Sequence, residues 1–326
     1  MLNVFAVDGR GCLVKAQDAP DAALPPEAIW LDLVAPTVAE ERLVETLLGV
    51  EVPTREEMQE IEVSSRLYEE NGALYMTATV VSRADTEHPE ASAISFILAG
   101  DRLVTVRYAD PQPFGLFASR CQRSPGTYPR GDAVLAGLLD ALIDRIADVL
   151  EHIGLEVDAL SHEVFEHPAT PRRGGDFQDI LRRLGRRGDL TSKVRESLVG
   201  VGRLLMFLGQ IGTPNTKAAK DLRNRLRTMT RDVRSLTEHA SFLSGKINFL
   251  LDATLGMINI EQNAIIKIFS VVAVVFLPPT LIASVYGMNF AFMPELASPF
   301  GYPLALALML GSAIAPLLYF KRRGWL

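Results

Sequence analysis

The C-terminal part of this chain of 326 residues contains two long stretches without a charged side chain. No Asp, Glu, Lys or Arg lies between Lys267 and Glu295, and none lies between Glu295 and Lys321. Of all residues 48% are hydrophobic although 22% are charged, so the apolar residues must be concentrated. We therefore expect residues 1–265 to form a soluble part that precedes two apolar segments.

Each uncharged stretch holds a segment long enough to cross a bilayer as a helix. The segments cover residues 268–286 and 302–320, and each has 19 residues. A rise of 1.5 Å per residue makes each helix about 28 Å long, which is close to a hydrocarbon core of about 30 Å. A pair of buried core helices is the alternative, and the length of the uncharged chain argues against it.

Charges beside the spans predict their orientation. The loop 287–301 carries one acid, Glu295, and no basic residue, whereas the tail 321–326 carries Lys321, Arg322 and Arg323. Basic residues are enriched in the short loops and tails that lie on the cytoplasmic side of a membrane. The tail and the soluble part are therefore expected in the cytoplasm, and the loop outside a plasma (inner) membrane. The first residues lack the pattern of a cleaved signal peptide.

The soluble part divides into an α/β domain and long helices. Residues 1–130 alternate β-like runs with two helical runs. The predicted strands are 2–7, 28–33, 73–81, 93–98 and 103–108, and the helical runs are 38–48 and 114–122. Residues 131–212 are expected to form antiparallel helices, over 133–165 and 176–209.

A third helix is expected as a stalk over residues 213–267, continuous with the first span. Counted from about residue 216 and unbroken as far as Tyr286, such a helix is about 105 Å long. Gly245 and Gly256 lie within it and are either hinges or positions of close packing.

Several function classes are disfavoured by composition and motif. The net charge of −6 disfavours nucleic-acid binding, and the cluster Arg182, Arg183, Arg186 and Arg187 is interpreted as a solvated helix face. Cys12 and Cys121 are expected to be reduced thiols. His162 and His167 are five residues apart and do not share a helix face, so no zinc motif is assigned. No nucleophile elbow or nucleotide-binding loop is present in the sequence, and we expect neither an enzyme nor an organic cofactor.

Small and polar residues follow one face of the first span. At 100° per residue, Asn263, Ser270, Leu277 and Ser284 fall within an arc of about 60°, with Thr280 a further 40° away. Such a face is typical of a water-lined pore. It also fits hydroxyl groups that bond back to helix carbonyls, or small residues that allow close helix packing. One lining helix per chain cannot enclose a pore, so a pore requires a ring of subunits.

The segment at the outer end of the first span resembles the CorA family. The resemblance lies in Gly287-Met288-Asn289, followed by Met293-Pro294-Glu295-Leu296. Similar segments are 261–263, 276–280, 319–326 and, upstream, 30–33. Within the family the similarity is greatest to the enterobacterial magnesium and cobalt transporters. The zinc-transporting branch of the superfamily remains an alternative, although Met288 and Met293–Leu296 argue against it.

The resemblance implies a homopentameric, funnel-shaped channel for divalent cations. Gly287, Met288 and Asn289 would form the selectivity filter, and Glu295 would concentrate cations in the outer loop. Phe269 matches an inner hydrophobic constriction. The positions implied to line the pore are Asn263, Ile266, Phe269, Ser270, Leu277, Thr280 and Ser284.

The family is regulated by cytosolic Mg²⁺, and the sequence offers several acids for such a site. Asp252 matches a membrane-proximal acidic position, whereas a stalk position that is Asp in some distant members is Thr228 here. Asp232 and Glu238 are further candidates, and for each acid a solvated face is the alternative.

The expected ion is Mg²⁺, with Co²⁺ and Ni²⁺ implied by the family alone. Neither span contains Asp, Glu, His or Cys. Amide and carbonyl oxygens can bind the waters of a hydrated ion weakly enough to release it. A membrane-anchored sensor without transport is the alternative from another class.

Overall fold

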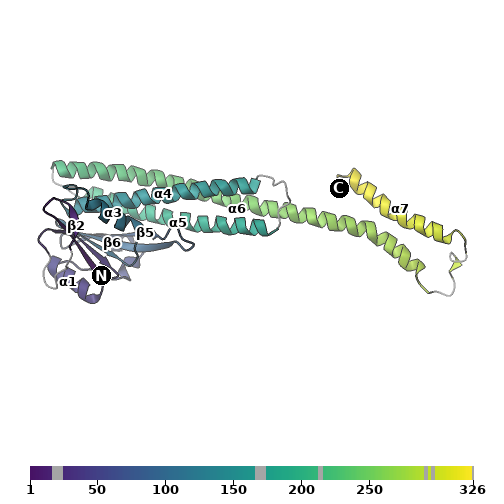
Figure 1. Ribbon diagram of the computed structural model, residues 1–326, viewed down its shortest axis with the longest axis horizontal. Coiled ribbons are helices and arrows are strands. Elements are labelled where there is room, and N and C mark those ends of the chain that lie inside the picture. Colours follow the sequence, from purple (N-terminus) through teal and green to yellow (C-terminus); the bar gives the residue numbers. More distant parts are fainter. Residues whose placement is uncertain (17–24, 166–173, 212–215, 290–292, 295–297, 325–326) are drawn as a thin grey trace. The chain divides into compact units, whose positions relative to one another are not determined.

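The computed structural model describes residues 1–16, 25–165, 174–211, 216–289, 293–294 and 298–324 (Figure 1). The chain forms two compact units. The first comprises Met1–Pro171 and Gln178–Leu251, and the second comprises Arg172–Phe177 and Asp252–Leu326. We describe them separately as the soluble unit and the apolar unit.

The soluble unit contains a seven-stranded sheet in the order β2-β1-β3-β7-β6-β5-β4. Neighbouring strands are antiparallel except β3 and β7, which are parallel and place Trp30 opposite Leu103. The strands are β1 (Leu2–Val7), β2 (Leu13–Lys15), β3 (Ala28–Val34), β4 (Leu67–Glu70), β5 (Ala73–Ser82), β6 (Glu90–Ala99) and β7 (Arg102–Arg107).

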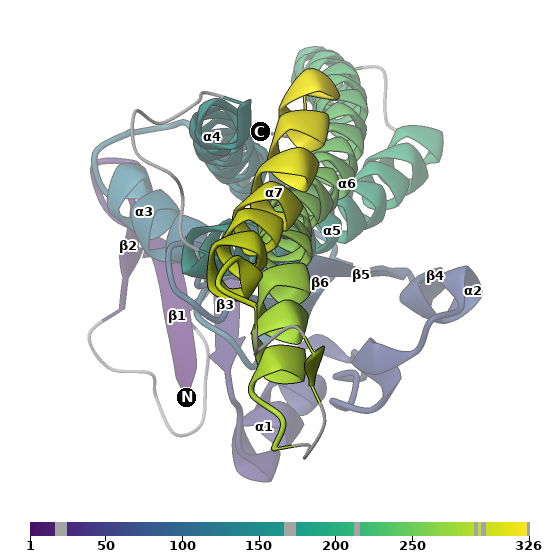
Figure 2. The same cartoon turned by 90° about the vertical axis from the view of Figure 1, so that its right-hand side faces the viewer.

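Helices cover both faces of this sheet, and Figure 2 shows α1 and α4 on opposite sides. Helix α1 (Val38–Leu48) and the short helix η1 (Glu57–Gln59) contribute Val44 and Met58 to a core with Leu31. On the other face, Trp30 packs against Phe117 of α3 (Gln112–Cys121). Successive residues of a strand point to opposite faces. Because helices cover both faces, the neighbouring residues Trp30 and Leu31 are both apolar and both buried.

A buried polar network joins β3 to β7. Asp32 and Arg107 are 2% and 6% exposed. The Arg107 Nε and Nη2 atoms donate to the two carboxylate oxygens of Asp32 at 3.0 and 2.9 Å. Thr105 Oγ1 donates to the same carboxylate at 2.8 Å, and Arg107 Nη1 donates to Asp110 at 2.6 Å. These bonds satisfy the buried charges within one chain, as burial requires.

Long helices complete the soluble unit. They are α4 (Gly131–Phe165), α5 (Gly174–Gln210) and the first part of α6 (Lys217–Tyr286), and Figure 1 shows them side by side. Their apolar faces pack together, with Leu138, Val194 and Leu243 each at most 3% exposed. The short helix α2 (Val63–Arg66) precedes β4.

The arginine cluster of α5 is more than a solvated face. Arg183 pairs with Glu163 at 2.8 Å, and Arg186 pairs with Glu87 at 3.0 Å. Arg187 donates to Glu156 of α4 at 3.0 Å. The side chains of Arg183 and Arg186 are 42% and 49% exposed, so these ion pairs lie on a helix face that remains open to solvent.

The apolar unit contains the second part of α6 and helix α7 (Gly301–Arg322). Both helices hold an 18-residue window apolar enough to cross a membrane, and only 6% of each window is buried. The expected fold class is confirmed: an α/β domain, a long helix and two apolar C-terminal helices.

Candidate functional site

The segment Gly287-Met288-Asn289 closes the apolar end of α6. The Gly287 N–H donates to the Ala283 carbonyl at 2.9 Å, and the Met288 N–H donates to the Val285 carbonyl at 3.3 Å. A Cβ at Gly287 would lie 3.1 Å from the Ala283 oxygen, so glycine suits this tight closing turn. Asn289 follows with an exposed side chain. The turn thus places the neutral side-chain amide of Asn289 directly beyond the end of the helix.

Glu295, the expected acid of the outer loop, lies outside the described residues. Its neighbour Pro294 is described and is exposed. The role of Glu295 therefore stays a prediction.

The predicted pore-lining residues are all exposed within a single chain. The apolar members Ile266, Phe269 and Leu277 are 60%, 70% and 72% exposed. The polar members are exposed as well, and they are Asn263, Ser270, Thr280 and Ser284. In the described parts of the two spans, the buried side chains are Val271 and Ala305, at 6% each. Among the described residues nothing covers the predicted lining face, so this face is available to water, to lipid or to another copy.

One hydroxyl of this face bonds back to the helix. Thr280 Oγ1 donates to the Phe276 carbonyl at 2.7 Å. This is one of the alternatives for the polar stripe, and at Thr280 the structure shows it. The hydroxyl oxygen keeps its acceptor lone pairs, so back-bonding leaves Thr280 able to accept from a water molecule.

Two prolines interrupt the bonding of α6 near this position. Pro278 and Pro279 lie inside the helix, and proline has no N–H for the carbonyl four residues earlier. Those acceptors belong to Val274 and Val275. Free carbonyls at membrane depth are tolerated where they face protein or a wet cavity. The prolines therefore add two acceptors to the span without adding a charge.

The candidate regulatory acids are separate from one another. Asp232, Glu238 and Asp252 are exposed, and Glu238 pairs with Arg234 at 3.2 Å. Thr228 donates its hydroxyl to the Asn224 carbonyl at 3.2 Å. Across the described ranges, no group of three or more His, Cys, Asp or Glu side chains could hold a metal ion. A regulatory metal site within one chain is therefore not formed by these residues.

Asp232 does influence a second helix. Burial, together with Asp140, Asp148 and Asp232, raises the pKa of Asp144, and Arg120 opposes the rise. Carboxylates of α4 and α6 thus repel one another in the soluble unit. An acid crowded in this way is destabilising when ionised.

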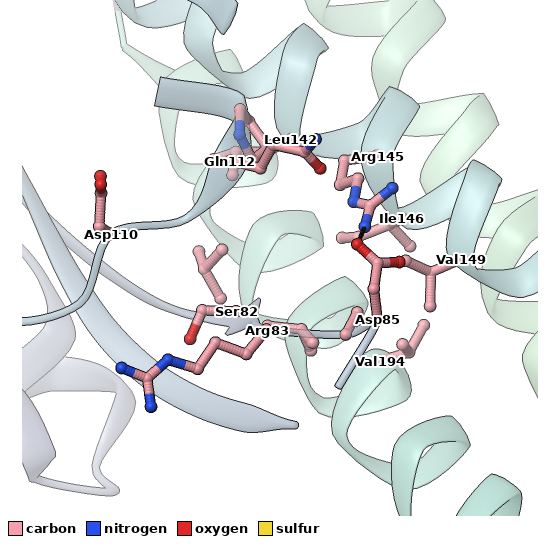
Figure 3. A pocket seen from close by; sticks show the side chains of 14 residues that line it. Ser82, Arg83, Asp85, Asp110, Gln112, Leu142, Arg145, Ile146, Val149 and Val194 are labelled. Atoms are coloured by element: carbon pink, nitrogen blue, oxygen red, sulfur yellow. Dashed lines mark hydrogen bonds and ion pairs between the residues drawn. The ribbon is translucent and has the colours of Figure 1, made fainter. Parts of the chain in front are cut away.

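A cavity of about 190 Å³ lies beside the end of β5 (Figure 3). Its walls come from β5, α3, α4 and α5, and they include Leu142, Ile146 and Val194. Its two carboxylates are both paired, Asp85 with Arg145 and Asp110 with Arg107. The Ser82 hydroxyl is buried and has no hydrogen-bond partner among the described residues. The cavity therefore offers no free acid to a cation, unlike the end of α6, which offers neutral oxygens.

Comparison with known proteins identifies a family whose match includes the Gly287-Met288-Asn289 segment. The family described as "CorA-like Mg2+ transporter protein" matches residues 26–322. The chain belongs to this family. It is 37% identical over 326 residues to a "Magnesium transport protein CorA" of Pectobacterium atrosepticum, covering 100% of both chains. It is 35% identical over 326 residues to the protein of that name from Haemophilus influenzae, again covering 100% of both chains.

The fold of this CorA-family chain is also found in solved structures. The complete CorA magnesium transporter of Methanocaldococcus jannaschii matches with a TM-score of 0.78 at 19% identity, covering 100% of this chain and 99% of that one. The ZntB cytoplasmic domain of Vibrio parahaemolyticus matches with a TM-score of 0.58 at 9% identity, covering 79% of this chain and 97% of that one. Both matches show a shared fold, and at these identities they show nothing beyond the fold.

Proposed function

We propose that this chain is a subunit of a magnesium channel of the plasma (inner) membrane. The observation that carries the proposal is the Gly287-Met288-Asn289 segment at the end of an exposed, charge-free helix. It occurs in a chain that matches curated magnesium transport proteins over its full length. The proposed assembly is a homopentamer, in which one Asn289 per chain becomes a ring of amide oxygens.

The chemistry of the span supports passage of a hydrated ion. Mg²⁺ loses its waters reluctantly and prefers oxygen ligands. The Asn289 amide, the Thr280 hydroxyl and the carbonyls freed by the prolines can accept hydrogen bonds from those waters. Phe269 and Leu277 supply apolar rings that can close the path by excluding water. Asp, Glu, His and Cys are missing from both spans in the sequence, which disfavours tight capture of Zn²⁺.

Transport requires no nucleotide in this proposal. Two positive charges that move inward gain about 4.6 kcal/mol per 100 mV of membrane potential. The basic residues Lys321 and Arg322 end α7 and support a cytoplasmic location for both termini. Residues 1–212 would then be cytoplasmic, and 213–267 would form the stalk. Co²⁺ and Ni²⁺ are proposed as further permeant ions.

Gating by cytosolic Mg²⁺ is proposed to involve acids of more than one subunit. Asp252, Asp232 and Glu238 are the candidates, and they are exposed and apart in a single chain. A site shared between copies would bring acids together that one chain keeps separate.

A flux assay tests the proposal. The purified chain is placed in liposomes with a negative-inside potential, and Mg²⁺ entry is measured alone and against Co²⁺, Ni²⁺ and Zn²⁺. We expect Mg²⁺ entry that Co²⁺ and Ni²⁺ reduce and Zn²⁺ does not. Entry of Zn²⁺ instead of Mg²⁺ would favour the zinc branch. Intact oligomers without any flux would favour a membrane-anchored sensor.

A further inference from the structure

The cavity beside the end of β5 is large enough for an aromatic ring. Its volume is about 190 Å³, whereas an apolar cavity of about 150 Å³ is enough to bind benzene in an engineered protein. The side chains of Leu142, Ile146 and Val194 form apolar walls, and each is at most 4% exposed. Mostly apolar walls with a few polar groups are typical of sites for small molecules. The cavity therefore offers room and apolar surface to a ring-sized ligand.

The arginine on the wall of this cavity is less exposed than its ion-pair partner. Figure 3 shows the guanidinium of Arg145, on α4, pointing toward the carboxylate of Asp85, which lies in the turn after β5. The Arg145 side chain is 24% exposed, whereas the Asp85 side chain is 72% exposed. An ion pair with so exposed a member contributes little to stability. Asp85 can therefore turn into solvent at low cost, but the guanidinium stays beside the apolar walls.

The other charged groups on the cavity wall have partners of their own. Arg83 is 66% exposed and pairs with Glu90 at 2.8 Å. Asp110 pairs with Arg107, whose side chain is 7% exposed, so this acid is held by a buried cation. Of the charged groups on the wall, Arg145 therefore combines apolar surroundings with a partner that is readily exchanged.

We propose that this cavity binds a small apolar carboxylate, the ring of which fills the space and the carboxylate of which takes the place of Asp85 on Arg145. An arginine binds a carboxylate through two parallel hydrogen bonds, so the exchange keeps the guanidinium paired. The wall also holds the Ser82 hydroxyl, which is buried without a hydrogen-bond partner among the described residues. A buried hydroxyl left unpaired costs free energy, so a ligand oxygen within its reach is favoured.

A cationic ligand is disfavoured at the same position. It would pair with Asp85 and leave the Arg145 guanidinium beside Leu142 and Ile146 without a partner. An unpaired charge beside apolar walls is costly. The charges therefore select an anion, and the walls select an apolar one. Because the walls come from β5, α3, α4 and α5, a bound ligand would contact the sheet and the helices at once. This inference goes beyond the proposed function and does not depend on transport.

Benzoate binding to the full-length chain in nanodiscs tests the proposal, measured by ligand-observed NMR titration. A ligand of this size is expected to bind with a dissociation constant on the order of 1 mM. Benzamide, which has nearly the same shape without the charge, should bind at least about tenfold more weakly. Empty nanodiscs measure how much benzoate enters the lipid.

Three variants locate the binding site. Arg145→Gln should weaken benzoate binding by about tenfold or more, because it removes a charge-assisted hydrogen bond. Asp85→Asn should strengthen binding by about two- to fivefold, because the competing carboxylate is gone. The matched control is Arg186→Gln. Arg186 pairs with Glu87 of the same turn at 3.0 Å but lines a different hollow, so this variant should keep its affinity for benzoate.

Each result either supports the site or overturns it. Asp85→Asn keeps the proposal testable if Arg145→Gln does not fold, because the Asp85 side chain lies mostly in solvent. Unchanged or weaker benzoate binding by Asp85→Asn would overturn the exchange of partners. Equal losses in Arg145→Gln and Arg186→Gln would indicate unspecific attraction to positive charge and would overturn the site. Equal affinity for benzoate and benzamide would do the same, as would the absence of saturable binding up to about ten times the expected constant.

Discussion

The soluble unit draws polar groups inward and pairs them, whereas the apolar helices turn apolar groups outward. Asp32 and Arg107 are almost fully buried and bond to one another. Phe269 and Leu277, in contrast, are 70% and 72% exposed. The soluble unit therefore satisfies its buried charges within one chain, whereas the predicted lining residues Phe269 and Leu277 are left exposed. Substitutions in the first region should change stability, and substitutions in the second should change transport.

The largest expected effect is on Mg²⁺ uptake, and it comes from a substitution at the end of α6. Asn289→Ala removes the proposed amide ring, so Mg²⁺ uptake into liposomes should fall to that of vesicles without protein. The oligomer should keep its size in light scattering, because the Asn289 side chain is exposed. Asn248→Ala, the same change at an exposed position of the soluble unit, should leave uptake unchanged. Normal uptake by Asn289→Ala would contradict the filter assignment.

The second prediction concerns the buried pair in the sheet. Asp32→Ala leaves the Arg107 guanidinium buried without its main partner and should lower the free energy of unfolding by about 3–5 kcal/mol. Asp110 contacts the same arginine, but its side chain is 81% exposed. Asp110→Ala should therefore cost no more than about 1 kcal/mol. Urea unfolding in detergent measures both, and equal costs would show that burial does not decide the effect.

Two glycines sharpen the contrast between packed and open faces. A Cβ at Gly131 would lie 2.5 Å from the Arg102 carbonyl carbon, so Gly131→Ala should destabilise the soluble unit by about 1–3 kcal/mol. A Cβ at Gly245 would meet no atom within 4 Å, so Gly245→Ala should stabilise the helix by about 0.5–1 kcal/mol. Thermal unfolding compares them.

The Gly245→Ala variant also distinguishes the two interpretations of Gly245, as a hinge or as a position of close packing. No described atom lies within 4 Å of a Cβ placed at Gly245, so close packing among the described residues does not explain the glycine. Unchanged Mg²⁺ flux in Gly245→Ala would argue against a hinge. A reduced flux without loss of stability would support one.

The smallest effect concerns two neighbouring acids of α1. Burial favours protonation of Glu40, but hydrogen bonds from the Thr37 and Leu2 backbones, the amino terminus and the Thr37 hydroxyl outweigh it and lower the pKa to about 2. A carboxylate whose pKa is lowered in the folded chain stabilises the fold at pH values above its ordinary pKa near 4.5. This stability is lost as the pH falls toward the lowered pKa of about 2. Glu40→Gln should lose at most about 1 kcal/mol at pH 7 and show a flatter stability profile between pH 5 and 2.

Glu41 should behave in the opposite sense. Burial and the charges of Glu45 and Glu40 raise its pKa, so its ionised form is unfavourable in the folded chain. Glu41→Gln should therefore raise stability at pH 7 slightly, and the gain should shrink as the pH falls toward the raised pKa. Parallel shifts in both variants would refute these assignments.

Periodicity explains most of what could be predicted from the sequence. The two-residue alternation and the uncharged stretches predicted the five longer strands and both apolar helices. The strands β2 and β4 were missed because they have three and four residues, too few for a pattern to emerge. The short elements η1 and α2 escaped for the same reason.

Contacts between distant residues were beyond such patterns. Asp32 and Arg107 are 75 residues apart and meet only because β3 and β7 are parallel neighbours. The partners of the α5 arginines lie on α4 and on the loop after β5, so local sequence could indicate a solvated basic face but not its ion pairs. At the candidate site, spacing alone predicted a common face for Asn263 and Ser284. The hydrogen bond from the Thr280 hydroxyl to the Phe276 carbonyl could not be predicted with certainty from the sequence. A hydroxyl can rotate to donate either to a helix carbonyl or to water.

The parallel pairing of β3 with β7 also sets an order of events during synthesis. Strand β3 lies between β1 and β7, so the centre of the sheet cannot close before Arg107 has been made. The first apolar span begins about 160 residues later, which corresponds to roughly 10–30 s of translation at 5–20 residues per second. The sheet can therefore close and bury its charged pair before the ribosome delivers a segment that must enter the bilayer. Folding in water and insertion into lipid are thus separated in time by the order of the elements along the chain.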